Sequence, residues 1–385
     1  MAETVLVAGA LAQRPGYGGH AWVLLQYLLG FRRLGWNVLF LDRLEPEMCI
    51  DRAGRPAPVE QSWNLACLRE LMERYGLGDA FSVACDGGRY YAGLSRAEVA
   101  RRADAAALLL NVMGFLKDPD VVGRPARRVF LDIDPGFGQM WHALGLADVF
   151  AGHDDHVTIG ENIGSPECTI PTCGLNWITT PQPVVLSEWP VADDADVAFT
   201  SVASWRGPDG PIEYEGVTYG LRVHEFRTFL PLPARTGLTF RIALDIDPAE
   251  TDDLARLADH GWTLVDPKVA AGSAWAYQAF VGKSLAEFGV AKQMYVRSRS
   301  GWFSDRSICY LASGKPVVVQ DTGLGGRYPT GEGLLTFATL DEAASAIEAV
   351  AREPLRHARA ARAIAEEHFD SNRVIGRLLG NLGLH

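Results

Sequence analysis

The sequence predicts an α/β protein made of two doubly wound, Rossmann-like domains that face one another, each a parallel sheet covered by helices. Short apolar runs that suit strands buried on both faces alternate along the chain with segments of helical periodicity. Loops rich in glycine and proline follow several of these runs. The length of 385 residues exceeds what one hydrophobic core usually supports, so two domains are expected.

The N-terminal segment predicts a strand, a glycine-bearing loop, a helix and a second strand. The strands are expected at residues 5–8 and 38–42, and the loop at residues 14–20. Between them, alanine and leucine recur at the spacing of one helix face, so the segment forms a βαβ unit. The backbone N–H groups of Gly18 and Gly19 can approach a ligand closely, because glycine has no side chain.

The rest of the first half predicts more elements of the same kind. Asp132 and Asp134 alternate along one expected strand, so they point to the same face, and Asp134 lies nearer the rim of the sheet. The expected elements are a helix at 65–75, a buried segment at 105–112, a strand at 128–134 and a strand with its loop at 157–164.

A domain boundary is expected at Pro181 and Pro183, because this segment can continue neither a helix nor the middle of a sheet. Residues 1–182 then form the first domain, residues 183–370 the second, and residues 371–385 a last helix. The second half predicts strands at 196–203, 241–245, 263–265 and 289–295. It predicts helices at 254–260, within 275–288, and at 341–352, 354–368 and 371–382.

The stretch 299–326 predicts a loop, a short helix, a buried strand and a second glycine-bearing loop. Ser304 can cap the helix by accepting a backbone N–H, and Gly314 is placed to end it. Pro316 precedes the apolar strand 317–320, which suits the interior of a parallel sheet. The helix therefore begins near the edge of the sheet at which ligands bind in open α/β folds.

Two groups of polar residues flank this helix and strand. The first surrounds the helix N-terminus, where free N–H groups, hydroxyls and a guanidinium favour a phosphate. The second follows the strand at its carboxyl end, where ligand hydroxyls are expected. The first group is Ser304, Asp305, Arg306 and Ser307, and the second is Asp321, Thr322 and Gly323.

Composition excludes several other classes of protein. The formal charge of −11 argues against a nucleic-acid scaffold and against attachment to an anionic membrane by charge. The six cysteines show no metal-binding spacing, and the absence of a signal sequence or spanning segment favours the cytoplasm. The run 153–156 (HDDH) could suggest a metal site, but four consecutive residues cannot easily surround an ion, so no metal is expected.

The chain resembles the nucleotide-sugar glycosyltransferases of the two-Rossmann GT-B fold, the bacterial group 1 families in particular. The resemblance rests on residues 18–20 (GGH) and 35–38 (GWNV), and on residues 311–319 (LASGKPVVV) and 331–335 (GEGLL). It implies that the first domain binds the acceptor, that the second binds a nucleotide-sugar donor, and that the last helix returns to the first domain. It also implies a small-molecule acceptor and no cofactor beyond the donor.

The resemblance implies roles for individual residues as well. His20 lies on a loop where inverting relatives often carry a catalytic histidine, and Arg206 lies where relatives commonly bind phosphate with an arginine. The expected catalytic bases are His20 and Asp134. The diphosphate is assigned to Gly18, Gly19, Arg206, Lys292, Ser304, Arg306 and Ser307, the sugar or ribose to Asp305, Asp321, Thr322 and Gly323, and the acceptor side to Glu161 and Asn162.

Alternatives remain open at this level. His20 could instead cap a helix, Arg206 could be a solvated loop residue, and Asp134 could cap a turn. Retaining relatives carry two glutamates at the positions of Gly301 and Cys309, so their absence puts retention of stereochemistry in question. The competing functions are a nucleotide-sugar 2-epimerase of the same fold and a non-catalytic subunit that binds a nucleotide sugar.

Overall fold

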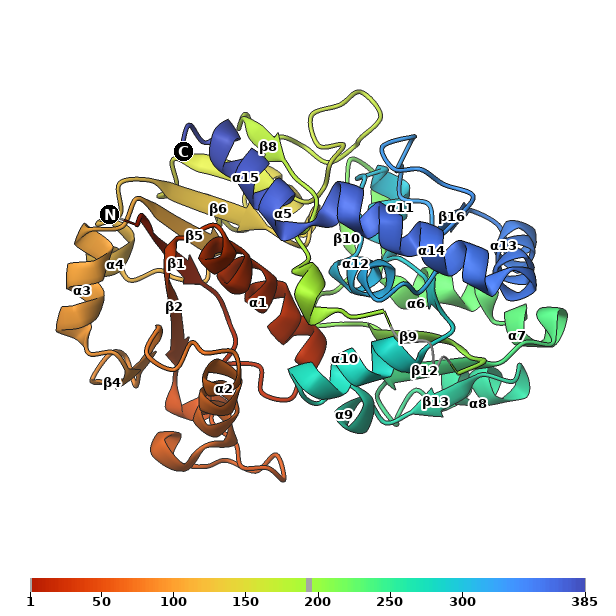
Figure 1. Ribbon diagram of the computed structural model, residues 1–385, viewed down its shortest axis with the longest axis horizontal. Coiled ribbons are helices and arrows are strands. Elements are labelled where there is room, and N and C mark those ends of the chain that lie inside the picture. The colour runs from red at the N-terminus through yellow and green to blue at the C-terminus, as the bar shows by residue number, and fades with distance from the viewer. Residues whose placement is uncertain (1, 192–195, 385) are drawn as a thin grey trace.

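The computed structural model describes residues 2–191 and 196–384, which form two parallel sheets side by side, each covered by helices (Figure 1). Within these residues the first sheet has the order β4-β3-β2-β1-β5-β6-β7-β8, and its only antiparallel pair is β3–β4. Its strands are β1 Thr4–Ala8, β2 Asn37–Leu44, β3 Phe81–Cys85, β4 Tyr90–Gly93, β5 Leu108–Val112, β6 Arg128–Asp132, β7 Asp155–Thr158 and β8 Trp177–Thr179.

The second sheet has the order β13-β12-β9-β14-β15-β16, and its strand pairs are all parallel in the described residues. A separate antiparallel hairpin, β10–β11, follows β9. These strands are β9 Phe199–Ser204, β10 Ile212–Tyr214, β11 Val217–Tyr219, β12 Phe240–Asp245, β13 Thr263–Val265, β14 Ala286–Gly289, β15 Val317–Gln320 and β16 Leu334–Phe337. The two sheets confirm the predicted α/β fold class.

Side chains of the central strands alternate between two hydrophobic layers, which explains their unbroken apolar sequence. In β1, Val5 and Val7 enter the large core shared with α1, whereas Leu6 and Ala8 enter a smaller core beneath α3 and α4. In β15, Val317 enters the same large core that holds Val5. One continuous apolar core therefore joins the two sheets.

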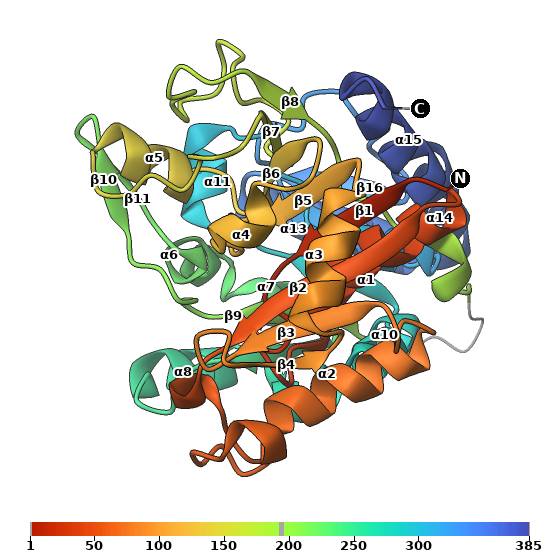
Figure 2. The ribbon, with the colours of Figure 1, turned by 90° about the vertical axis from the view of Figure 1, so that its left-hand side faces the viewer.

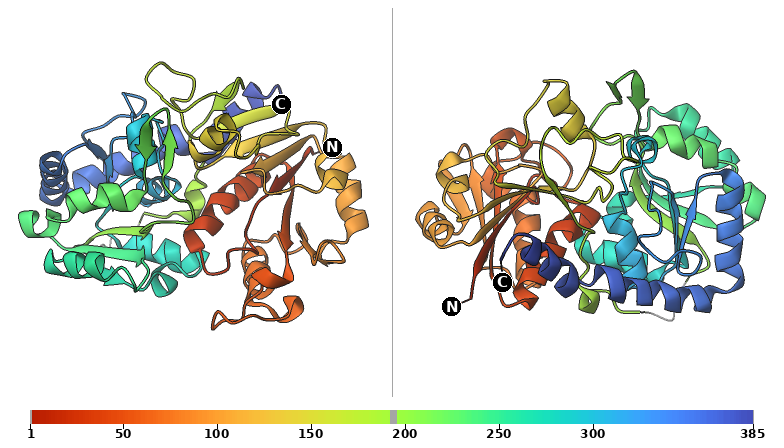
Figure 3. Two further views of the ribbon diagram at one scale, coloured as in Figure 1. Left: turned by 180° about the vertical axis from the view of Figure 1, so that it is seen from behind. Right: turned by 90° about the horizontal axis from the view of Figure 1, so that it is seen from above.

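Helices cover both faces of each sheet, and Figure 2 shows α3 in front of the first sheet with α1 on its other side. The last helix, α15, packs against α1 of the N-terminal half (Figure 3). The helices are α1 Gly18–Arg33, α2 Trp63–Arg74, α3 Arg96–Asp104, α4 Pro119–Val122, α5 Phe137–Ala143, α6 Arg222–Phe226, α7 Leu232–Thr236, α8 Thr251–Asp259, α9 Pro267–Ala270, α10 Ala274–Lys283, α11 Gln293–Ser298, α12 Asp305–Ala312, α13 Leu340–Arg352, α14 Pro354–Ile364 and α15 Ser371–Asn381.

One expected element is wrong. Residues 289–295 do not form a strand, because the strand is β14 (Ala286–Gly289) and the chain then turns into α11 (Gln293–Ser298). The apolar residues Val290 and Ala291 are buried in the loop between the two elements. A short apolar run next to a real strand cannot be told from an extension of that strand by periodicity alone.

The two halves meet closely at the beginning of α1. The Gly18 N–H donates to the carbonyl of Ala271 at 2.7 Å, and a methyl group on Gly18 would lie 2.1 Å from the carbonyl oxygen of Ser273. A Cβ on Gly19 would lie 3.2 Å from the ring of Tyr277. Glycine at these positions therefore allows α1 to pack against residues 271–277. The Gly18 amide is bonded to Ala271 in this structure, and its predicted contact with a phosphate stays a prediction.

We expect Gly18→Ala to lower the free energy of unfolding by about 1–3 kcal/mol, because the added methyl forces backbone apart. Gly376→Ala is the matched control, since Gly376 lies in α15 with no atom within 4 Å of its added Cβ. That change should stabilise the protein by up to about 1 kcal/mol through helix propensity. Urea unfolding of both variants checks the prediction, and equal effects would contradict it.

Candidate functional site

A cavity of about 820 Å³ lies between the loop that precedes α1 and the carboxyl ends of β9 and β12. Parallel strands of both sheets direct their carboxyl ends and following loops towards it, which is the usual position of a ligand site in this architecture. Its lining residues come from both halves of the chain and are mostly polar. They include Gln13, Arg14, Tyr17, His20, Ser204, Arg206, Asp245, Asp247 and Glu250.

His20 lines this cavity in the first turn of α1. Its Nε2 lies 3.1 Å from the carbonyl oxygen of Ala10, and since a carbonyl only accepts, Nε2 carries the proton. Burial, reinforced by the charge of Arg14, lowers the pKa of His20 to about 4. The ring is therefore neutral at neutral pH, and its Nδ1 is the nitrogen that can accept a proton.

Asp134 connects the two halves of the protein. Its Oδ2 accepts from Nζ of Lys292 at 2.5 Å, and its Oδ1 accepts from the hydroxyl of Tyr295. Both partners follow β14 in the second half. This pairing ties Asp134 to Lys292 and Tyr295 across the two halves, and the predicted roles of Asp134 as a catalytic base and of Lys292 as a diphosphate ligand stay predictions.

At the N-terminus of α12 Ser304 forms the predicted cap, and Arg306 forms an ion pair that was not predicted. The hydroxyl of Ser304 accepts from the N–H of Arg306 at 3.1 Å. The Arg306 guanidinium, however, donates to the carboxylate of Glu287 at 2.5 Å, and the side chains are 9% and 0% exposed. It also donates to the carbonyl of Val202 at 3.1 Å. Arg306 therefore compensates a buried carboxylate on β14, and its predicted contact with a diphosphate stays a prediction.

Arg222 is the residue that sequence reasoning missed. At the start of α6 its guanidinium donates to the carbonyls of Val290 at 2.9 Å and Ser204 at 3.0 Å. No carboxylate among the described residues forms an ion pair with it. Burial, with the neighbouring charge of Arg306, lowers its pKa to about 10. No local motif marks Arg222, and only the packing of α6 against the ends of β9 and β14 brings it here.

Ser307 and Asp305 lie beside these cations at the beginning of α12. The hydroxyl of Ser307 is fully buried and has no hydrogen-bond partner in the described part of the chain. Burial raises the pKa of the Asp305 carboxyl, while the charges of Arg306 and Arg222 oppose that rise. The region thus combines the positive end of a helix dipole, an unsatisfied hydroxyl and a guanidinium that forms no ion pair with a described carboxylate.

Arg206 follows β9 and lines the cavity, as its position in the sequence suggested. Its guanidinium binds the carboxylate of Glu250, with the second contact at 3.0 Å, and its side chain is 46% exposed. The exposed pair holds Arg206 weakly, because solvent-exposed ion pairs contribute little to stability. Arg206 is therefore free to exchange Glu250 for a ligand anion.

The turn after β15 is held by hydrogen bonds of its own side chains. The carboxylate of Asp321 accepts from the N–H groups of Gly323 at 3.0 Å and Leu324 at 3.1 Å. The hydroxyl of Thr322 donates to the carbonyl of Trp302 at 2.6 Å. The sequence assigned Asp321, Thr322 and Gly323 to sugar or ribose, and the structure shows that the two polar side chains already bond within this loop system.

Glu161 and Asn162 lie in contacts between the two halves rather than on an open acceptor surface. The amide of Asn162 donates to the carbonyls of Arg299 at 2.9 Å and Gly323 at 2.7 Å, and Glu161 accepts from the hydroxyl of Tyr328. A Cβ on Gly301, whose φ is +69°, would lie 2.8 Å from Cγ of Asn162. Asn162 thus occupies the space that a glutamate at position 301 would need.

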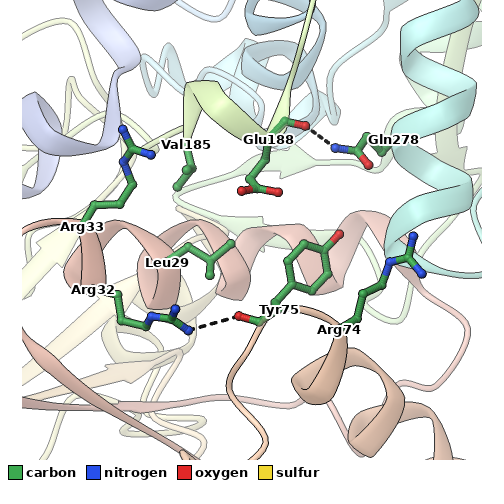
Figure 4. Close-up of a pocket in the computed structure, with 8 residues that line it drawn as sticks. All are labelled: Leu29, Arg32, Arg33, Arg74, Tyr75, Val185, Glu188 and Gln278. Carbon is green, nitrogen blue, oxygen red and sulfur yellow. Dashed lines mark hydrogen bonds between the residues drawn. The ribbon is translucent and has the colours of Figure 1, made fainter.

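A second hollow, of about 670 Å³, lies at the other end of α1 (Figure 4). Its arginines already have partners: Arg32 donates to the carbonyls of Tyr75 and Gly76, Arg33 donates to Ser187, and Arg74 stacks over Trp275. It lies away from the carboxyl ends of the strands. We therefore place the candidate site in the 820 Å³ cavity and at the adjoining N-terminus of α12.

The described residues contain neither a cluster of metal ligands nor a helix suited to span a membrane. In residues 2–191 and 196–384 no three His, Cys, Asp or Glu side chains converge as ligands for a metal ion. His153, within the run 153–156, instead lies 2.9 Å from the carbonyl of Phe150 and 3.0 Å from the amide of Asn111. No helix in the same part of the chain is long and apolar enough to cross a bilayer.

Comparison with solved structures shows that the chain has the GT-B fold. The alpha-glucosyltransferase AGT in complex with UDP is 10% identical, with a TM-score of 0.56 and all of both chains covered. AviGT4, a glycosyltransferase involved in avilamycin A biosynthesis, is 14% identical, with a TM-score of 0.55 over 98% of this chain and 96% of its own. HepE of Anabaena in complex with UDP is 14% identical, with a TM-score of 0.54 and full coverage of both chains.

No protein-family model and no curated protein sequence matches the chain. The likeness in three dimensions confirms the expected GT-B fold, which the resemblance of short sequence phrases had implied.

Removing one partner of the Glu287–Arg306 pair should destabilise the folded protein. We expect Glu287→Ala to lower the free energy of unfolding by about 3–5 kcal/mol, because it leaves Arg306 as an uncompensated buried charge. The double change Glu287→Met with Arg306→Leu should recover at least half of that loss, since an apolar pair needs no counter-charge. Chemical denaturation measures both, and a double variant as unstable as the single one would refute the argument.

The lowered pKa of His20 predicts a pH dependence of stability. Between pH 4 and 6.5 the unfolded state binds the proton and the folded state does not. The free energy of unfolding should therefore rise by up to about 3 kcal/mol as the pH increases through that window. The difference between wild type and His20→Gln, measured by urea unfolding from pH 4 to 7.5, isolates this contribution. A difference that is constant with pH would show that the folded protein does not lower the pKa of His20.

Proposed function

We propose that this protein is a glycosyltransferase that moves a sugar from a nucleoside-diphosphate sugar, of the UDP type, to a nucleophile on a small-molecule acceptor. The GT-B fold supports the proposal, since AGT and HepE share it and their structures contain UDP. The observation that carries it is specific to this chain: Arg222 is a half-buried guanidinium that forms no ion pair with a described carboxylate, beside the N-terminus of α12.

A diphosphate would satisfy the groups that the protein leaves open here. Burying an unpaired cation costs free energy, and an anionic ligand at the same place removes that cost. The N-terminus of α12 supplies N–H groups and a positive dipole end for a phosphate. Lys292 would exchange Asp134 for the diphosphate when the donor binds, and Arg206 would exchange Glu250 in the same way.

The transfer step then has a definite assignment of atoms. The bond between the anomeric carbon and the diphosphate oxygen breaks, and the electron pair leaves with the nucleoside diphosphate. The acceptor nucleophile, an oxygen where the acceptor is an alcohol, forms the new bond to the anomeric carbon and loses its proton. Nδ1 of His20 accepts that proton, while Arg222, Lys292 and the α12 N–H groups stabilise the departing diphosphate.

Binding of nucleoside diphosphates tests the proposal directly. UDP should raise the melting temperature more than TDP, GDP or ADP, because a ligand that binds the folded state stabilises it. Arg222→Gln and Lys292→Gln should each weaken UDP binding about tenfold or more, since each removes a charged hydrogen bond. Lys283→Gln, an exposed change at the end of α10 that lines none of these pockets, is the control. Failure of all four nucleotides to shift the melting temperature would refute a nucleotide-sugar site.

Turnover separates the remaining functions. A transferase releases UDP from a UDP-sugar only with an acceptor, an epimerase yields the 2-epimer of the sugar, and a binding subunit binds UDP without turnover. In the transferase, His20→Gln should lower kcat/KM by about 10²–10⁴. UDP affinity in this variant should remain unchanged.

A further inference from the structure

A preformed pocket of about 320 Å³ lies in the N-terminal half, between the first sheet and the helices α3 and α4. It opens where β2 and β3 end, at the same edge of the sheet as the larger cavity. Gln13 links the two, because it lines the 820 Å³ cavity and donates at 2.8 Å to Asp42, which lines the smaller pocket. The pocket and the cavity therefore share a wall.

The floor of this pocket is apolar. Leu41 and Val99 are 4% and 2% exposed, and Val121 is also buried. They belong to the small core between the sheet and α3 and α4, with Leu116 packed against it. An apolar floor at the end of a core favours the ring or hydrocarbon part of a ligand.

The acidic groups around the pocket already have partners in the backbone. Asp42 accepts from the N–H groups of Ala12 at 2.6 Å and Arg43 at 2.7 Å, and burial raises its pKa to about 7. Glu45 accepts from the N–H of Gly87 at 2.9 Å, and Asp118 caps α4. These carboxylates repel an anion less than their number suggests, because N–H groups neutralise them in part and Asp42 is partly protonated near neutral pH.

Unlike these carboxylates, the cations around the pocket have few hydrogen-bond or ion-pair partners. The side chains of Arg43 and Lys117 are exposed, and neither forms a hydrogen bond or ion pair with any described residue. Arg96 pairs only with the exposed Asp120, at 2.7 Å. The hydroxyl of Tyr91 has no described partner either. The free donors at this rim are therefore mostly cationic.

We infer that this pocket binds a small amphipathic anion, with an aromatic or aliphatic body on the apolar floor and a carboxylate or phosphate held by Arg43 and Lys117. The volume equals that of about ten waters, which suits one ring with a charged substituent. If the proposed transferase function holds, on which this further step rests, the shared wall with the cavity makes such an anion the acceptor. The acceptor class is then a small organic acid or phosphate.

Isothermal titration calorimetry with phenyl phosphate and benzoate tests the pocket without knowledge of the natural ligand. At least one of the two compounds should bind the full-length protein. The one that binds more tightly shows whether the pocket prefers a phosphate or a carboxylate. If phenyl phosphate is the better probe, inorganic phosphate and phenol should each bind at least tenfold more weakly than phenyl phosphate. If benzoate is the better probe, acetate and phenol should each bind at least tenfold more weakly than benzoate. Such a result requires both the cationic rim and the apolar floor.

The double variant Arg43→Gln with Lys117→Gln should weaken the better probe at least tenfold. Lys283→Gln should leave it unchanged, and circular dichroism should show that all three proteins are folded. Equal affinity in the double variant and wild type, or no binding of either probe, would overturn the inference. UDP binding is measured in the same samples, so loss of the probe with retained UDP affinity locates the failure in this pocket and not in the donor site.

Discussion

The buried pair between Arg306 and Glu287 fixes the geometry on which the candidate site depends. Its two side chains lie almost entirely out of water, where neither charge is tolerable without the other. The pair connects the first turn of α12 to β14, and the contact of Arg306 with Val202 adds β9. The N-terminus of α12 is thereby held at the carboxyl ends of these strands. Glu287 neutralises the Arg306 guanidinium, whereas the neighbouring Arg222 carries a charge that no described carboxylate pairs with.

Close contact between the halves has a second physical cause, which is the absence of side chains at two positions. Gly18 lets α1 approach the carbonyls of residues 271–273, and Gly301 leaves room for Asn162. Polar contacts across the same boundary, such as Asp134 with Lys292, use groups that a charged ligand could take over. Apolar packing and glycine contacts thus set how the halves meet, while exchangeable ion pairs lie at the site itself.

The two pockets differ in the way they manage charge, and that difference suggests different ligands. At the α12 N-terminus Arg306 is buried and Arg222 is half-buried beside the strand ends, which is the setting that the proposal assigns to a diphosphate. At the edge of β2 and β3 the cations are exposed and flank an apolar floor, a setting for a small acid with a hydrophobic body. The two pockets are neighbours through Gln13 and Asp42, which suits the donor and acceptor sites proposed for them.

Local sequence alone determined the elements with strong internal signals: the βαβ unit at the N-terminus, the capped helix α12 and the strand Val317–Gln320. Their periodicity, caps and apolar runs act within a few residues. Local sequence could not separate β14 from the loop before α11. It also could not show that Arg306 faces Glu287, that the Gly18 amide bonds Ala271, or that Arg222 bonds Ser204 beside the cavity. Those facts depend on which side chains distant segments bring together, because charge compensation and close backbone contact exist only between packed elements.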